Sequence, residues 1–405
     1  MGYYKQALSG ISWMGALRVV TRGLAFVKIA ILARIFSPAQ FGIYGIASLV
    51  LGFLEMLTET GINIFLIQKQ EKVDKYIDSA WVVSIVRGTI ISSVIFLVAP
   101  IIANYFDNSG STLIIRLISL VPLIRGFINP SCVKYQKNLE FKKQFFYDSS
   151  LFFVDFLIAI ALGLITKSEN SLVIAMIGST LLEVVLSFIF FDPKPKFIFD
   201  KEKTMEVINR GKWITGAGVF NYLFQNLDDI LVGKMMGAGN LGVYQLAYKV
   251  STLPVSEVGE VFNKVTFPIY SSIKDDPQRI KKTFLKTLLV ICLFVIPFGL
   301  IVFYFPTQIV NILLGEKWLV AVPVLQVLAI FGVLKAITNS FFSLFLGIER
   351  QEVVTLITLF STFVLIGLLY PLIKIFGLLG AGFATIFATV ATIPLLIYFF
   401  FKYFK

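Results

Sequence analysis

Long apolar runs recur from one end of this chain to the other. Each has about 20 or more mainly apolar residues, the length that an α-helix needs to cross roughly 30 Å of hydrocarbon. Because lipid offers the backbone no hydrogen bonds, such runs without polar alternation form helices. With 57% hydrophobic residues, the chain is too apolar for a soluble domain. We therefore predict an all-α integral membrane protein with about twelve transmembrane helices, over residues 11–35, 41–67, 77–103, 111–131, 147–166, 170–191, 211–236, 241–270, 284–305, 320–347, 353–374 and 377–401.

Lysine and arginine are distributed unevenly between the predicted loops. If the N-terminus is cytoplasmic, alternate loops and the C-terminus hold most basic residues, and the opposite loops hold Lys167, Lys317 and Lys374. Since positive charge gathers on the cytoplasmic side, this asymmetry predicts a multi-pass protein of the cytoplasmic membrane with both termini in the cytoplasm. The net charge of +12 is then a basic membrane face that suits anionic lipids, and not a nucleic-acid-binding signal.

Several kinds of enzyme and cofactor site have no signature in the sequence. Histidine is absent, the two cysteines lack a ligand spacing, and there is no phosphate-binding loop of an ATP-driven pump. The stretch "GAGNLG" (237–242) fits a dinucleotide-binding pattern, but it joins two predicted spans and follows no strand. A membrane-embedded polymerase or ligase would need a large outside loop, and no predicted outside loop reaches even 20 residues. We expect no catalytic residue, no metal, no cofactor and no enzymatic activity.

One short phrase occurs twice. "ILARIFSPAQFGIYGIA" (31–47) aligns with "ILVGKMMGAGNLGVYQLA" (230–247) if one residue is inserted, and six predicted helices separate the copies. An even number of helices gives both halves the same orientation, as in transporters built from two parallel repeats. We therefore predict two six-helix lobes, 1–191 and 210–405, joined by a basic cytoplasmic linker, 192–209. Chance similarity between two apolar segments is the alternative.

The shared glycine and tyrosine of the repeated phrase also have a local interpretation. Tyr44 and Tyr244 occupy the same position in the two copies. Glycine suits the tight start of a helix, and tyrosine is a common anchor at the membrane interface. We predict both tyrosines as interfacial anchors.

Basic side chains within the predicted spans are informative, because charge at membrane depth is costly and usually faces a cavity or a partner. Arg18, Arg22 and Lys28 lie within about 120° of arc on the first helix, which contains no carboxylate to neutralise them. This basic stripe predicts an anionic ligand. Lys249 and Lys264, in the eighth span, are the corresponding candidates in the second half.

Acidic and polar side chains form a second group of cavity candidates. They are Glu55, Glu59, Asn63, Glu257 and Glu260. A purely structural role is open for several: Glu260 and Lys264 neutralise each other at i,i+4, and Glu55 or Glu59 neutralises Arg22. Asp228 and Asp229 of the seventh span bind a coupling cation or pair with Lys249, and the sequence leaves both alternatives open.

At this point the motifs also resemble a known family. The segment 221–279, which begins "NYLFQNLDDILVGK", looks like the start of the second half of polysaccharide flippases, the group with O-antigen and teichuronic acid exporters. "ILARIFSPAQFGIYGIA" with "ETGINIFLIQKQ", then "YQKNLEFKKQ" and "NILLGEKWLVAVPVLQVLA", resemble that group in the same order. The superfamily also contains multidrug and toxin extrusion transporters and the peptidoglycan lipid flippase. Many members have two further C-terminal spans, so any role of those helices is expected to be absent or supplied otherwise.

The resemblance implies a substrate and a mechanism. It implies a flippase that moves polyprenyl-pyrophosphate-linked oligosaccharides by alternating access, with glycosyltransferases or a glycan polymerase as partners. The basic stripe would hold the pyrophosphate, faced by Lys249. Asp228 and Asp229 are the nearest counterparts of the acidic residue that related lipid flippases use for a coupling cation, Na⁺ or H⁺.

A multidrug or organic-cation antiporter on the same fold is the alternative. Such a transporter favours acidic and aromatic cavity walls. The predicted first-lobe spans carry six basic residues (Arg18, Arg22, Lys28, Arg87, Arg116 and Arg125) against four acidic ones (Glu55, Glu59, Asp155 and Glu183). This balance favours an anionic substrate.

Overall fold

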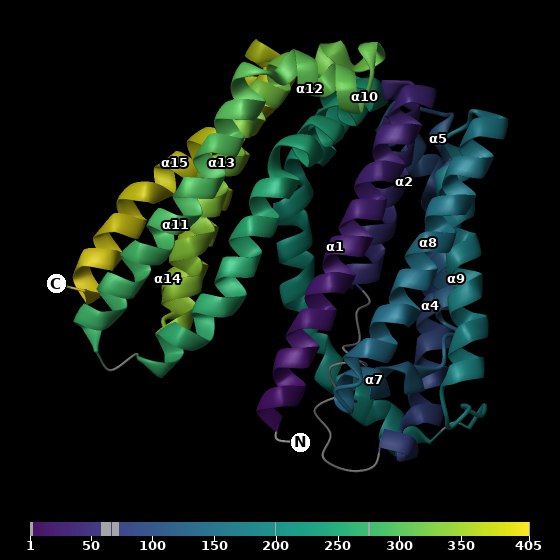
Figure 1. Cartoon of the computed structure of the whole chain (residues 1–405). Coiled ribbons are helices and arrows are strands. Elements are labelled where there is room, and N and C mark those ends of the chain that lie inside the picture. The colour runs from purple at the N-terminus through teal and green to yellow at the C-terminus, as the bar shows by residue number, and fades with distance from the viewer. Residues whose placement is uncertain (1–2, 58–65, 67–72, 199, 274–275, 405) are drawn as a thin grey trace. The chain divides into compact units, whose positions relative to one another are not determined.

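The computed structural model describes residues 3–57, 66, 73–198, 200–273 and 276–404, and the elements found there are helices joined by short connections (Figure 1). Because each long apolar run must satisfy its backbone hydrogen bonds internally, the helices follow the runs closely. The α-helices are α1 (Tyr3–Ile35), α2 (Pro38–Leu57), α4 (Ile77–Tyr105), α5 (Ser111–Ile118), α6 (Leu120–Arg125), α7 (Lys134–Lys137), α8 (Phe141–Thr166), α9 (Asn170–Phe190), α10 (Lys201–Ser272), α11 (Pro277–Tyr304), α12 (Pro306–Leu313), α13 (Val322–Gly347), α14 (Gln351–Phe376) and α15 (Leu378–Tyr403). Short 3₁₀ turns are η1 (Val73–Lys75), η2 (Pro130–Val133) and η3 (Glu316–Ala321).

The predicted spans coincide with helices over the part of the chain that the structure describes, except that the predicted span 111–131 is broken after Arg125 and bends by 74° there. Eight of these helices are long and apolar enough to cross a membrane, and a bent pair, Ser111–Arg125 with Pro130–Lys137, raises the number to nine. The remaining predicted spans, 11–35, 211–236 and 241–270, correspond to α1 and to the two parts of α10. These segments carry several of the charges at membrane depth, Arg18, Arg22 and Lys28 on α1 and Asp228, Asp229 and Lys249 on α10, which lower their mean hydropathy.

The predicted loop between the seventh and eighth spans is shorter than expected. α10 continues through it, and within the helix the backbone departs from helical geometry at Gly237, with φ 82° and ψ 172°. Side chains other than glycine are strained in this region of backbone space. A single glycine therefore separates the two membrane helices of α10.

Replacing Gly237 by Ala is expected to destabilise the protein. The cost in free energy of unfolding should be about 1–3 kcal/mol, the usual backbone strain of a non-glycine residue at this geometry. No steric clash adds to it, because a Cβ at this position would meet nothing within 4 Å. The melting temperature in detergent would measure it. Gly239→Ala is the matched control, since a Cβ there also meets nothing within 4 Å and its φ is not positive. Equal melting temperatures for both variants would contradict the strain.

The chain divides into two compact units, Met1–Asn226 and Leu227–Lys405, called unit 1 and unit 2 below. The predicted lobes, 1–191 and 210–405, and the linker 192–209 stay a prediction, because this division groups the first part of α10 with unit 1.

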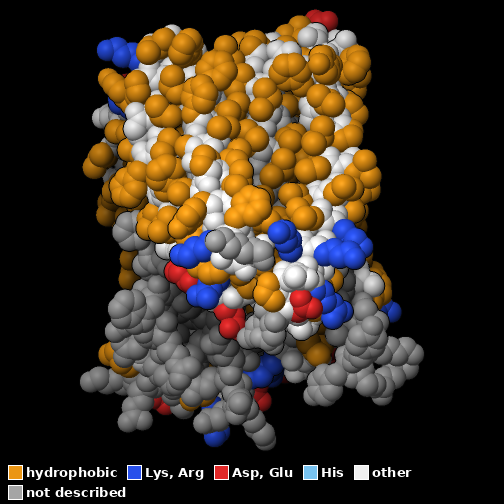
Figure 2. Space-filling view, turned by 90° about the vertical axis from the view of Figure 1, so that its left-hand side faces the viewer, with side chains coloured by type: hydrophobic (Ala, Val, Ile, Leu, Met, Phe, Trp, Pro, Cys, Tyr) orange, Lys and Arg blue, Asp and Glu red, His pale blue; other side chains and the backbone are white. Residues whose placement is uncertain are grey.

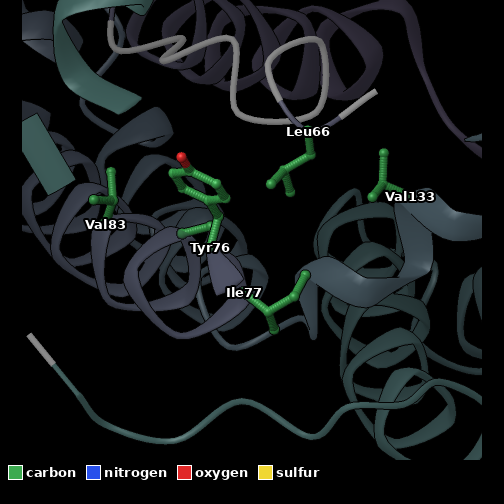
Figure 3. Close-up of a cluster of buried hydrophobic side chains, with 6 residues drawn as sticks. Leu66, Tyr76, Ile77, Val83 and Val133 are labelled. Carbon is green, nitrogen blue, oxygen red and sulfur yellow. The ribbon is translucent and has the colours of Figure 1, made fainter. Parts of the chain in front are cut away.

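In unit 1, α8 packs against both α1 and α9, and α4 packs against α5 and α6. A cluster of buried hydrophobic side chains in this unit includes Leu66, Tyr76, Ile77 and Val133 (Figure 3).

Unit 2 is held together by α13. This helix packs against α11 and α15, and α15 packs against α14. Aromatic side chains fill the core at one end, where Phe284 of α11 contacts Phe341 of α13 and Phe400 of α15, with ring centroids 4.8 and 5.3 Å away. Such contacts between large rings fix the helices against one another.

Large apolar side chains cover the outside of α11, α14 and α15. Leu289, Phe363 and Tyr370 are more than half exposed. Figure 2 shows this face as a broad hydrophobic band with lysine and arginine side chains gathered at its lower border. A soluble protein rarely exposes so large an apolar surface, and the pattern is that of lipid-facing helices with a charged interface.

Candidate functional site

The basic stripe of α1 lies in unit 1, and one of its members, Lys28, has an acidic partner. Lys28 forms an ion pair with Asp155 of α8. Both side chains are less than one-fifth exposed, so each charge depends on the other for compensation. Arg18 is half-buried and Arg22 is exposed on the same helix. The assignment of these three cations to a substrate stays a prediction, and an anion at Lys28 would compete with Asp155.

Breaking this ion pair on one side is expected to destabilise unit 1. Lys28→Met leaves Asp155 poorly solvated and uncompensated, which should cost about 3 kcal/mol, the lower end of the range for broken buried pairs. Melting in detergent would measure the loss. The double variant Lys28→Met/Asp155→Leu should recover most of it, because no charge is then stranded. A double variant as unstable as the single one would contradict the pairing.

The acidic candidate Glu55 is bound by arginines from two other helices. Its Oε1 lies 2.6 Å from Arg125 Nη1, and its main-chain oxygen accepts a hydrogen bond of 2.9 Å from Arg87. The sequence offered Arg22 as the partner of Glu55, and the structure adds Arg125 of α6. Glu59 and Asn63 lie outside the described residues, so their placement stays a prediction.

The two aspartates of α10 form the most deeply buried acidic group that the structure describes in unit 2. Asp228 is 7% exposed and accepts a hydrogen bond of 2.8 Å from Tyr244 Oη. Asp229 accepts one of 3.2 Å from Gln245 Nε2. Tyr244 is 1% exposed, so the prediction of an interfacial anchor is wrong for this tyrosine. Its hydroxyl is used instead to satisfy a buried carboxylate.

Two lysines lie near these aspartates, Lys335 of α13 on the side of Asp228 and Lys249 of α10 on the side of Asp229. Lys249 is exposed, whereas Lys335 is half-buried and donates a hydrogen bond of 2.7 Å to Tyr248 Oη. Nothing in the sequence singles out Lys335 as a neighbour of this site, because the sequence does not show that α13 packs against this part of α10.

Three further candidates cannot be placed. The side chains of Glu257, Glu260 and Lys264 lie outside the described residues of α10. Their roles as cavity residues, and the alternative that Glu260 and Lys264 neutralise each other, stay predictions.

The two units thus use opposite arrangements of charge. In unit 1 the base, Lys28, lies on α1 and the acid comes from α8. In unit 2 the acids lie on α10, just before the second copy of the repeated phrase, and a base, Lys335, comes from α13 and binds Tyr248 of α10. Tyr244 and Gln245, which bind the acids, belong to that copy. Such buried ionisable groups are typical of ion and substrate pathways in membrane proteins.

Known protein structures share this fold. The lipid II flippase MurJ in an inward closed conformation superimposes with a TM-score of 0.74 at 14% identity, covering 96% of this chain and 87% of that one. An inward-facing multidrug resistance MATE family transporter of the MOP superfamily gives 0.70 at 13% identity, covering 97% and 98%. The predicted all-α membrane fold of the MATE-like type is therefore confirmed, and its division into two parallel six-helix repeats stays a prediction.

Sequence relatives narrow the family. The chain is 26% identical to the lipopolysaccharide biosynthesis protein WzxC of Escherichia coli (strain K12), over 90% of this chain and 75% of WzxC. It is 26% identical to the teichuronic acid biosynthesis protein TuaB of Bacillus subtilis (strain 168), over 86% and 72%. A family model described as "Polysaccharide biosynthesis protein" matches residues 31–323, which is more than two thirds of the chain. This multi-pass membrane protein belongs to the polysaccharide biosynthesis protein family.

Proposed function

We propose that this protein is a flippase that moves polyprenyl-pyrophosphate-linked oligosaccharide units across the cytoplasmic membrane for surface polysaccharide synthesis. The family match over residues 31–323 carries this conclusion. The fold, which is also that of a lipid II flippase, supports it. The protein acts as a transporter and not as an enzyme.

The substrate explains why a protein of this kind is needed. A pyrophosphate with a hydrated glycan would have to leave water and cross hydrocarbon, and burying such charged and polar groups without partners is very costly. Two repeats that expose a polar path alternately to each side remove that cost, while the polyprenyl tail stays in lipid. Glycosyltransferases that build the glycan, and a polymerase that joins the units, are the expected functional neighbours.

The pyrophosphate is bound by cations of α1. Arg18 and Arg22 are the main candidates, since arginine binds phosphate oxygens in a bidentate manner. Lys249 and Lys264 of α10 are the candidates in the second half. Lys28 takes part where the substrate displaces Asp155, with which it is paired.

The acidic pair Asp228 and Asp229 holds a coupling cation, Na⁺ or H⁺. The burial of Asp228 and its hydrogen bond from Tyr244 support this role, because a carboxylate at this depth is stabilised by binding a cation or a proton.

With both termini in the cytoplasm, as the basic loops predict, substrate enters from the cytoplasmic leaflet.

A multidrug antiporter is the weaker candidate. Its fold is the same, and an organic cation would require carboxylates available to it. In unit 1, Glu55 is already bound by Arg125 and Asp155 by Lys28. These two carboxylates are compensated within the protein, and the relatives are named for polysaccharides rather than drugs.

The proposed function is tested by lipid analysis of a host in which the gene is deleted. Polyprenyl-pyrophosphate oligosaccharides would be quantified by mass spectrometry and assigned to a leaflet. We expect the complete unit to accumulate on the cytoplasmic leaflet, with surface glycan lost and restored by the wild-type gene. Unchanged lipid intermediates together with new sensitivity to cationic drugs would favour the antiporter.

A further inference from the structure

Lys335 is held in a defined position beside the acidic pair of unit 2. Its Nζ is 2.7 Å from Tyr248 Oη, 5.3 Å from the centroid of the Tyr248 ring and 5.5 Å from that of Phe331. The two rings are themselves 5.9 Å apart, so they form an aromatic corner around the ammonium group. A cation over aromatic faces in a poorly hydrated site is stabilised by cation–π attraction.

The aromatic corner and the acidic pair belong to one continuous arrangement. Tyr244 and Tyr248 are one helical turn apart on α10, with ring centroids 6.4 Å apart. The Tyr244 hydroxyl donates a hydrogen bond to the Asp228 carboxylate, and the Tyr248 hydroxyl accepts one from the Lys335 ammonium group. This chain of contacts brings the ammonium group of Lys335 near Asp228. Lys335 therefore supplies positive charge near the site where an external cation would bind.

The two lysines near the acidic pair differ in their surroundings. Lys249 is exposed, and water or lipid headgroups can take up its charge. Lys335 is half-buried against two rings, so its charge is screened less and acts more strongly on nearby carboxylates. Lysine is also flexible enough to swing its ammonium group within a site while its stem stays packed.

We propose that Lys335 is a tethered competitor for the cation site of unit 2. Its ammonium group compensates Asp228 when the site is empty, and an external monovalent cation binds only by taking over that role. Lys335 is thus a positioning residue that sets the cation affinity of the acidic pair. The competition keeps the empty site neutral enough to persist at membrane depth, and it keeps cation affinity low enough for release. This inference rests on the proposed role of Asp228 and Asp229.

The experiment measures Na⁺-dependent stabilisation of the purified full-length protein. The melting temperature is followed as NaCl replaces choline chloride at constant ionic strength, and the half-saturating Na⁺ concentration is determined. We expect Lys335→Gln to lower this concentration by about tenfold or more, because one opposing charge is removed from a poorly screened site. Lys335→Arg, which keeps the charge, should retain the wild-type value. Lys374→Gln, an exposed lysine on α14, is the matched control and should change nothing.

Two further results separate this inference from the role of the acidic pair. Adding Asp228→Asn and Asp229→Asn to Lys335→Gln should abolish the Na⁺ response; a response that survives places the cation elsewhere and overturns the proposal. If the two Asn substitutions abolish the response of the wild-type protein but Lys335→Gln leaves the half-saturating concentration unchanged, the acidic site stands and the competition is wrong. A Lys335→Gln variant without any Na⁺ response also overturns it.

Discussion

Glycan export should fall at least about tenfold when Arg18 and Arg22 are both replaced by Gln. Each charge-assisted hydrogen bond to a phosphate contributes roughly 1.5–3 kcal/mol, and the two arginines lie on the same side of α1. The loss should appear in the cellular assay as accumulation of lipid-linked oligosaccharide on the cytoplasmic leaflet, with the protein still present in the membrane.

The matched control is Arg34→Gln, which removes the same charge from the last turn of the same helix. It should leave export close to wild-type. Full export by the Arg18→Gln/Arg22→Gln variant at normal protein abundance would show that the stripe does not hold the pyrophosphate, although the flippase assignment, which rests on the family, would stand.

The double variant Asp228→Asn/Asp229→Asn should lose gradient-driven export. Asparagine retains an oxygen that can accept the hydrogen bonds from Tyr244 and Gln245, so the fold is expected to persist. Asparagine cannot take up a proton as a carboxylate does. Because it carries no negative charge, it also binds a metal cation more weakly. Export should drop by about tenfold or more, because the variant can no longer use the Na⁺ or H⁺ gradient as a driving force. The export that remains should not change when the Na⁺ or H⁺ gradient is collapsed.

A surface carboxylate provides the comparison for this variant. Glu352→Gln removes a charge from the start of α14, where the side chain is 62% exposed, and should leave both export and its gradient response unchanged. Persistence of the gradient response in the Asp228→Asn/Asp229→Asn variant would assign coupling to other residues.

The helices could be predicted because a bilayer leaves few alternatives. Apolar run length determines where a spanning helix can lie, and in the described part of the chain the predicted spans coincide with helices except at 111–131, where the structure has a bent pair. The boundary inside α10 was harder to place, because one glycine replaces the loop that the small residues of 237–242 suggested. Local sequence cannot distinguish a short loop from a single non-helical residue.

The charged partners could be predicted much less well. Lys28 and Asp155 are 127 positions apart, and the pairing depends on α1 packing against α8. The same holds for Glu55 with Arg125, and for Lys335, whose neighbour Tyr248 is on another helix. Helical periodicity places side chains on one face of a helix, but it does not say which helix that face meets. Tertiary packing supplied that information.

The opposite charge arrangements of the two units show an advantage of carrying both repeats in one polypeptide, because the two repeats can then diverge from each other in sequence. A symmetric dimer of six-helix chains would carry every substitution twice, once in each subunit. Joining both repeats in one polypeptide lets each half change alone, so one half can keep a lysine on its first helix while the other carries aspartates there. A chimera built from two copies of unit 1 would contain two Lys28–Asp155 pairs and no acidic pair. A fused chain can therefore use one half to bind an anion and the other half to bind a cation, whereas a dimer of identical halves has the same binding groups in both.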